Sequence, residues 1–188
     1  MELPIYQIDA FASRLFEGNP AAVIPLQQWL PDDLLQAIAA ENNVSETAYF
    51  LPDGDGFQIR WFTPVNEVDL CGHATLASAY VLFFILGYAQ HKITFFSKSG
   101  ILTVSHDKDL LIMDFPAQPP VPCEIPAELM QAFATVPTAC LRSMDFIAVF
   151  KHERDIETAE PDFQQLMKLD LRGVIITAQS DRWDFVAR

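Results

Sequence analysis

The feature that most constrains the fold is an apolar run in the middle of the chain. Residues 74–86 are apolar except for Thr75 and Ser78, and Gly87 follows them. The run is too short to span a bilayer, which takes about 20 apolar residues, so it favours a helix from about His73 to Leu86. A helix that is apolar almost all round has to be enclosed by other structure. The sequence therefore predicts a buried central helix and no membrane span.

Strand patterns lie on both sides of this run. Asp53-Gly54-Asp55-Gly56 has the composition of a hairpin turn. Pro31 followed by two aspartates marks the start of a helix that ends at Asn42-Asn43, because proline suits the first helical position and carboxylates suit the first turn. Short segments of apolar and β-branched residues bounded by turn residues predict strands, at residues 5–11, 21–24, 47–51, 57–62, 93–96, 101–105 and 110–115.

A proline-rich run separates these elements from a second unit. Five prolines fall between Pro116 and Pro126, which predicts a linker and two units, residues 1–115 and 116–188. In the second unit we expect helices and strands in alternation, with helices at residues 125–133 and 162–169 and strands at residues 146–150, 173–178 and 183–187.

The two units resemble each other weakly. In the first, Pro31-Asp32 opens a helix that leads through a strand, a polar turn and a return strand to Arg60. In the second, Pro161-Asp162 opens the same succession, which reaches Arg188 over nearly the same length. This succession is common, so chance is the alternative; we favour a duplication whose second lobe lacks its own enclosed helix. An incomplete lobe exposes an apolar sheet face, so we expect a homodimer or a poorly ordered second lobe.

Composition excludes several classes of partner. Hydrophobic residues make up 51% of the 188 positions, enough for a sizeable core, and the formal net charge is −13. Nucleic acids and anionic membranes need clustered Lys and Arg, so we expect neither, whereas a small anionic ligand needs only a local positive field. The three cysteines form neither a disulfide framework nor a metal-ligand spacing. Because Glu2 and Pro4 lead directly into a strand pattern instead of a signal peptide, we expect a reduced, cytoplasmic protein without a metal.

The best candidate for chemistry is the start of the central helix, at Cys71-Gly72-His73. The first amides of a helix have no internal partner and favour anions, and glycine lets a ligand approach the backbone, so a substrate carboxylate could bind there. Cys71 could supply a thiolate, and His73 could donate or shuttle a proton. Either residue alone is better explained as a small buried side chain or a capping residue. Their combination beside Gly72 favours a functional site.

A second candidate is Glu46, which lies where an apolar strand begins. Burial would suit this carboxylate to general acid/base work. A glutamate that points to solvent at the start of a strand is the alternative, and spacing alone favours it. Gly18-Asn19-Pro20 is weaker still, since most such tripeptides are turns.

Taken together, these segments resemble the phenazine-biosynthesis PhzF-like family. The order and spacing match over about the first 115 residues, and the match is thin beyond them. The resemblance implies an α/β (α+β) fold like that of diaminopimelate epimerase, in which two pseudo-symmetric lobes each wrap a sheet around a central helix and the active site lies between the lobes. The matching segments are Gly18-Asn19-Pro20, Ser45-Glu46-Thr47, Arg60-Trp61-Phe62-Thr63-Pro64 and Cys71-Gly72-His73-Ala74-Thr75-Leu76-Ala77.

The resemblance also implies a reaction. The family moves a proton without a cofactor, and its phenazine enzyme isomerises dihydro-3-hydroxyanthranilate. Its catalytic glutamate falls on Glu46, its glycine–histidine pair falls on Gly72 and His73, and Cys71 takes the place of a catalytic base in the related epimerases and racemases. A small carboxylated, amino-acid-like substrate is implied, with binding residues at Asn19, Ser45, Gly72, Ala74 and Thr75.

One family segment is not found in this sequence. The second lobe of the family carries an Asp-Pro-x-Thr-Gly-Ser type segment that opens the second central helix. Without it the second half of the site is missing, so whether the chain is an enzyme stays open. Three functions remain: a PhzF-like isomerase that uses Glu46, an epimerase or racemase that uses Cys71, and an inactive or binding-only protein. Sensitivity of turnover to thiol alkylation separates the first two.

Overall fold

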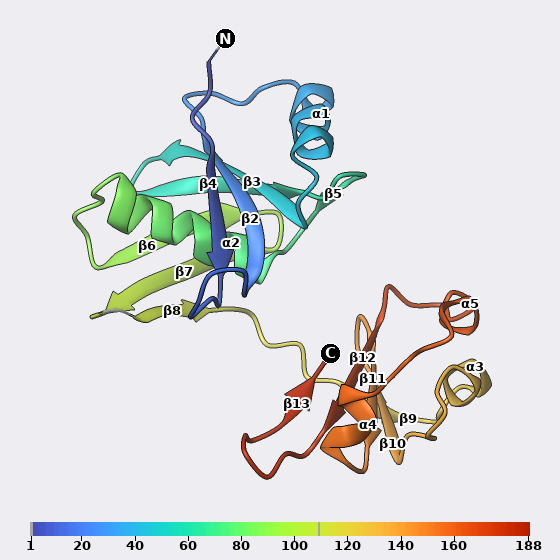
Figure 1. Cartoon of the computed structure of the whole chain (residues 1–188). Helices are drawn as coiled ribbons and strands as arrows, with labels where there is room; N and C mark the ends of the chain where they lie inside the picture. The colour runs from blue at the N-terminus through green and yellow to red at the C-terminus, as the bar shows by residue number, and fades with distance from the viewer. Residues whose placement is uncertain (1, 109) are drawn as a thin grey trace. The chain divides into compact units, whose positions relative to one another are not determined.

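The structure is a computed structural model that describes residues 2–108 and 110–188. The chain forms two compact units, residues 1–116 and 117–188. In Figure 1 the first unit runs from blue to yellow-green and the second from yellow to red. Each unit has a mixed α+β architecture with a sheet of its own.

The first unit is built on an eight-stranded sheet in the order β1-β2-β3-β4-β6-β7-β8, with β5 beside β4. Neighbouring strands are antiparallel except for the parallel pairs β2–β3 and β4–β6. Seven of the strands lie close to the expected positions, whereas the two-residue strand β5 was not expected. The bounds of β1 to β8 are Tyr6–Ala10, Asn19–Pro25, Glu46–Asp53, Gly56–Phe62, Glu67–Val68, Lys92–Ser97, Gly100–Asp107 and Leu110–Asp114.

One helix lies on each side of this sheet. Helix α1 (Asp32–Asn42) begins after Pro31, ends at Asn43 in the left-handed conformation, and contributes Leu35 to a small core with Tyr49. Helix α2 (Gly72–Tyr80) packs against β1, β2, β3 and β8. Because α2 touches strands from both ends of the sheet, the sheet curls around it (Figure 1).

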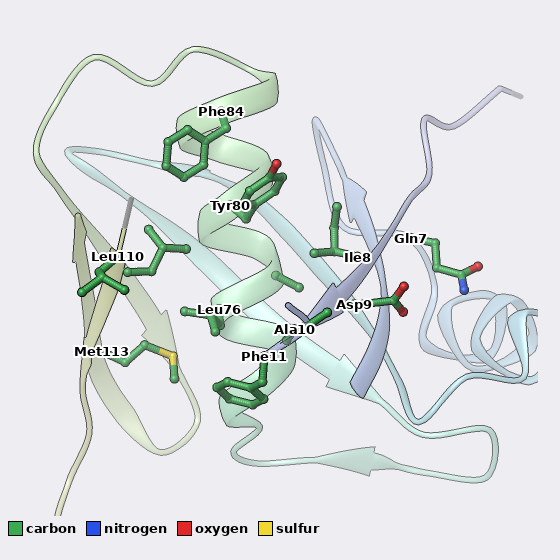
Figure 2. Close-up of a pocket in the computed structure, with 13 residues that line it drawn as sticks. Gln7, Ile8, Asp9, Ala10, Phe11, Leu76, Tyr80, Phe84, Leu110 and Met113 are labelled. Carbon is green, nitrogen blue, oxygen red and sulfur yellow. The ribbon is translucent and has the colours of Figure 1, made fainter. Parts of the chain in front are cut away.

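The central helix differs from the expected one in two respects. The α-helix stops at Tyr80 and continues as a π-helical turn, η1 (Val81–Ile85), in which Leu86 N donates to Val81 O at 2.8 Å. The expectation of enclosure on every side is also wrong, since Tyr80 is 43% exposed and Phe84 is 49% exposed. The physical reason is that the curled sheet does not close: β1 and β8 are its two ends, and a stripe of the helix lies between them (Figure 2).

The second unit contains a five-stranded sheet in the order β13-β12-β11-β10-β9. Its bounds for β9 to β13 are Val121–Cys123, Ala139–Arg142, Phe146–Phe150, Val174–Ala178 and Val186–Ala187. The succession of antiparallel β10–β11, parallel β11–β12 and antiparallel β12–β13 repeats that of β1–β2, β2–β3 and β3–β4. The two lobes are therefore pseudo-symmetric in topology.

The helices of the second unit are shorter than expected. They are α3 (Ala127–Gln131), α4 (Glu153–Glu157) and α5 (Phe163–Leu166). The sequence did not predict α4, because this single turn lies in a charged segment without apolar periodicity and depends on a capping box between His152 and Asp155. Strands β9 and β10 were also missed. Pro122 fits within β9 because that strand is the edge of its sheet.

Within the described residues, the structure contains no helix long and apolar enough to cross a membrane.

Candidate active site

Two chain segments distant in sequence bring a carboxylate, a thiol and an imidazole together. Glu46 is the first residue of β3, and Cys71 precedes α2 in an extended conformation that places His73 in the first helical turn. His73 Nε2 lies 3.2 Å from Glu46 Oε2, and His73 Nδ1 lies 3.5 Å from Cys71 Sγ. One ligand atom from each of Glu46, Cys71 and His73 lies within 4.8 Å of the other two. We call these three residues the site trio.

The site trio is sheltered but not saturated with hydrogen bonds. The side chain of His73 is 10% exposed and that of Glu46 is 20% exposed. Glu46 Oε2 and His73 Nε2 lie within ion-pair distance, yet neither atom makes a hydrogen bond of good geometry with a described residue. We interpret this contact as electrostatic proximity without a well-aligned hydrogen bond. Burying a polar atom without a hydrogen-bond partner costs free energy. Both atoms are therefore available to bond a group of a ligand.

The thiol of the site trio has low reactivity. Burial raises the pKa of Cys71 to about 12, and the neighbouring charge of Glu46 acts in the same direction. At neutral pH Cys71 is therefore a thiol and not a thiolate. Since the thiolate is the reactive form of cysteine, the structure gives Cys71 little basicity in the absence of a ligand.

The start of α2 supplies the anion-binding element beside the site trio. The first amides of a helix lack carbonyl partners inside it, and Gly72 and His73 occupy that turn. A Cβ atom on Gly72 would lie 3.2 Å from Phe115 Cε2, closer than ordinary van der Waals contact, so glycine allows the ring to pack against this turn. The sequence did not single out Phe115, because its proximity to Gly72 depends on the path of the chain through β8.

The other expected substrate-binding residues fall into two groups. Asn19 begins β2 and accepts a hydrogen bond at 3.0 Å from the hydroxyl of Ser45, which directly precedes Glu46. Ala74 and Thr75 are completely buried, and the Thr75 hydroxyl donates to the carbonyl of Cys71 at 2.6 Å. These residues therefore either lie close to a member of the site trio in the sequence or are hydrogen-bonded to a residue that does. Their roles in substrate binding remain predictions.

The site trio also offers one ligand atom of each type that a metal could use, all within 4.8 Å of one another. Glu46 lies beside Nε2 of the imidazole and Cys71 beside Nδ1.

Comparison with known proteins establishes the family. The model of the PhzC-PhzF family, described as phenazine biosynthesis-like protein, matches residues 8–188. The chain is 50% identical over 188 residues to an uncharacterized isomerase of Pseudomonas aeruginosa, covering all of this chain and 73% of the relative. This chain therefore belongs to the PhzC-PhzF family of phenazine biosynthesis-like proteins.

Solved structures agree with this assignment. A PhzF-family phenazine biosynthesis protein from Enterococcus faecalis superimposes with a TM-score of 0.93 at 44% identity, covering all of this chain and 73% of that one. A predicted epimerase from Pseudomonas aeruginosa matches with a TM-score of 0.66 at 22% identity, over 93% of this chain and 70% of that one. The second likeness shows a shared fold, which confirms the expected epimerase-like architecture.

Proposed function

We propose that the site trio carries out cofactor-independent proton transfer on a small carboxylated, amino-acid-like substrate, with Glu46 as the acid/base. The observation that carries this proposal is the pairing of Glu46 Oε2 with His73 Nε2 at 3.2 Å, sheltered from solvent and without aligned hydrogen bonds, beside the start of α2. A carboxylate oxygen without a hydrogen-bond partner among the described residues is free to accept a proton from a ligand.

The steps follow from the positions of these groups. The substrate carboxylate binds the free amides at Gly72 and His73, where the helix dipole favours negative charge. Glu46 accepts a proton from a substrate C–H bond, and the electron pair left behind delocalises into the conjugated system of the substrate. Glu46 then returns the proton to another carbon, which shifts a double bond without any net redox change. His73 orients the Glu46 side chain and can offer an N–H to its carboxylate whenever Glu46 is deprotonated.

A Cys71-based epimerase is supported less well. The raised pKa of the Cys71 thiol keeps it protonated at neutral pH. A base of this kind has to lose its proton before it can act.

Solvent exchange tests the proposal with the chain as it is. Dihydro-3-hydroxyanthranilate is incubated with the protein in D₂O, and deuterium in the recovered compound is measured by mass spectrometry. Exchange at one carbon needs a single acid/base, whereas complete isomerisation also needs delivery to a second carbon. We expect enzyme-dependent exchange that Glu46→Gln removes. Exchange no faster than in buffer, or equal exchange by the variant, would overturn the proposal.

A further inference from the structure

Two cysteines of the second unit lie directly opposite each other in its sheet. Strands β9 and β10 are antiparallel, and Cys123 of β9 is the register partner of Cys140 of β10. Partners of this kind point to the same face of a sheet, with Cα atoms about 4.5–5.5 Å apart. Disulfides join residues whose Cα atoms lie about 4.4–6.8 Å apart. The two free thiols are therefore placed for a bond.

The two thiols differ in their access to solvent. Cys140 is buried in the core of the second unit, whereas Cys123 is half-buried against the same core on the edge strand. Burial raises the pKa of Cys140 to about 12, and the neighbouring thiol of Cys123 acts in the same direction. A reagent from solvent therefore meets Cys123 first, with Cys140 directly behind it. The sequence did not indicate this pair, because it depends on β9 and β10, which were not expected.

A bond between them would close a loop that contains part of the core. Residues 124–139 include α3, and Leu129 and Phe133 of this segment belong to the same buried cluster as Cys140. Strand β9 is held to β10 over three register pairs, and Pro122 in its middle has no N–H to donate. A disulfide removes conformational freedom from the unfolded chain and so stabilises the loop that it closes. The bond would therefore stabilise this edge of the sheet.

We propose that Cys123 and Cys140 form a reversible cross-strand disulfide when the protein meets hydrogen peroxide, and that the bond links β9 covalently to the core of the second unit. The Cys123 thiolate attacks one peroxide oxygen and becomes a sulfenic acid, and the O–O bond breaks with release of water that carries the thiol proton. The Cys140 sulfur then bonds to the Cys123 sulfur. It displaces the hydroxyl group, which leaves as a second water with the proton of the Cys140 thiol.

The redox change balances without any further reactant. The two thiols together lose two electrons, and the peroxide gains them as it becomes two water molecules. A dithiol reductant restores both thiols by exchange. Cys71 has no such partner, because the two other cysteines of the chain both belong to the second unit. This inference does not depend on the proton-transfer chemistry.

Peptide mapping of the whole chain provides the test. The reduced protein is treated with hydrogen peroxide, remaining thiols are alkylated, and the chain is cut without reduction by a protease specific for glutamate. This protease separates the two cysteines at Glu124 and Glu128. We expect mass spectrometry to show the two cysteine peptides joined, and a dithiol to separate them. Two free thiols after treatment, sulfinic acid at Cys123 without a link, or links only between two protein molecules would each overturn the proposal.

Two matched variants and a second readout locate the effect. Cys123→Ser changes a half-buried edge residue and should form no link, whereas Cys71→Ser should form the link as the unchanged protein does. Amide hydrogen exchange should be at least about tenfold slower in β9 and α3 of the oxidised protein than in the reduced one. Cys123→Ser should show no such change with peroxide. A linked protein that exchanges these amides as fast as the reduced one would contradict the stabilising role of the bond.

Discussion

The two units of the chain share a strand topology but carry different groups at the end where their parallel strand pairs begin. In the first unit, parallel β2 and β3 begin side by side, with Ala21 opposite Glu46. In the second, parallel β11 and β12 begin side by side in the same relation, with Phe146 opposite Val174. A carboxylate lies at this end in each unit, but on different strands of the pair: Glu46 begins β3, whereas Asp145 directly precedes β11, the counterpart of β2.

These two carboxylates have different partners. Asp145 accepts hydrogen bonds from the guanidinium of Arg172, including one from Nε at 3.1 Å. Glu46 instead faces the imidazole of His73 without an aligned hydrogen bond, next to the start of a helix. The comparison teaches that the chemistry of a carboxylate at a strand end depends on whether a neighbouring side chain already satisfies it with hydrogen bonds.

Exchanging both carboxylates for amides gives the largest expected contrast between the units. Glu46→Gln removes the only proposed proton acceptor and should lower the rate of deuterium exchange by about 100-fold or more, as is usual for loss of a general acid/base. Asp145→Asn changes the carboxylate at the same end of the second unit's parallel strand pair and should leave the rate within about twofold, because its role is to hold Arg172. Rates are measured by mass spectrometry on variants whose melting shows them to be folded. Equal losses would mean that the exchange reports stability and not chemistry.

The fold was predictable where local patterns dominate. The strand β11 appears at residues 146–150 as expected, and α1 begins after Pro31, because alternation and capping act within a few residues. The open stripe at Tyr80 and Phe84 was not predictable, since an apolar helix surface looks the same in sequence whether or not the surrounding sheet closes. That property depends on which strands become edges.

The site was predictable in its residues but not in its geometry. Cys71, His73 and Glu46 stood out by their positions at a helix start and a strand start. Their arrangement around the imidazole depends on long-range pairing of β2 with β3 and on the packing of α2. The proximity of Phe115 to Gly72 had no sequence signal at all.

Ion pairs also differ between the units, and removing one arginine from each tests the difference. Arg60 bonds Glu67 through Nε at 2.7 Å, and both side chains are less than a fifth exposed. It also lies over the ring of Phe62 at 5.0 Å. Arg60→Met should cost roughly 2–3 kcal/mol of unfolding free energy, less than for a fully buried pair because Lys98 still contacts Glu67.

The matched change in the second unit is Arg182→Met. Arg182 is 67% exposed and pairs with Glu153, so water and salt screen the interaction and the change in stability should be small. Amide hydrogen exchange followed separately in residues 1–116 and 117–188 measures both variants. If Arg182→Met destabilised the second unit as much as Arg60→Met destabilises the first, the two ion pairs would not differ in their contribution to stability.

Acid should destabilise the first unit through the same ion pair. The hydrogen bond from Arg60 lowers the pKa of Glu67 to about 2, from the usual value near 4.5. Because the folded pKa is depressed, the stabilisation is fully present above about pH 4.5 and is lost as the pH falls toward 2. Amide exchange in residues 1–116 should therefore quicken over this range, and Glu67→Gln should flatten the dependence. An unchanged pH profile in that variant would assign the acid sensitivity to other groups.

Cys71→Ser should have the smallest effect, and it separates the two proton-transfer chemistries. The pKa of Cys71 is raised to about 12 by burial, so the thiol is protonated at neutral pH and contributes no base. Serine keeps a small polar group beside His73 Nδ1, and we expect deuterium exchange within about threefold of the unchanged protein, compared with the large loss in Glu46→Gln. Alkylation supplies a second readout: iodoacetamide should modify half-buried Cys123 of the second unit before buried Cys71. If Cys71→Ser instead abolished exchange as completely as Glu46→Gln, the thiol would have to ionise when substrate binds. The site would then be that of a two-base epimerase, with His73 carrying the proton between Cys71 and Glu46.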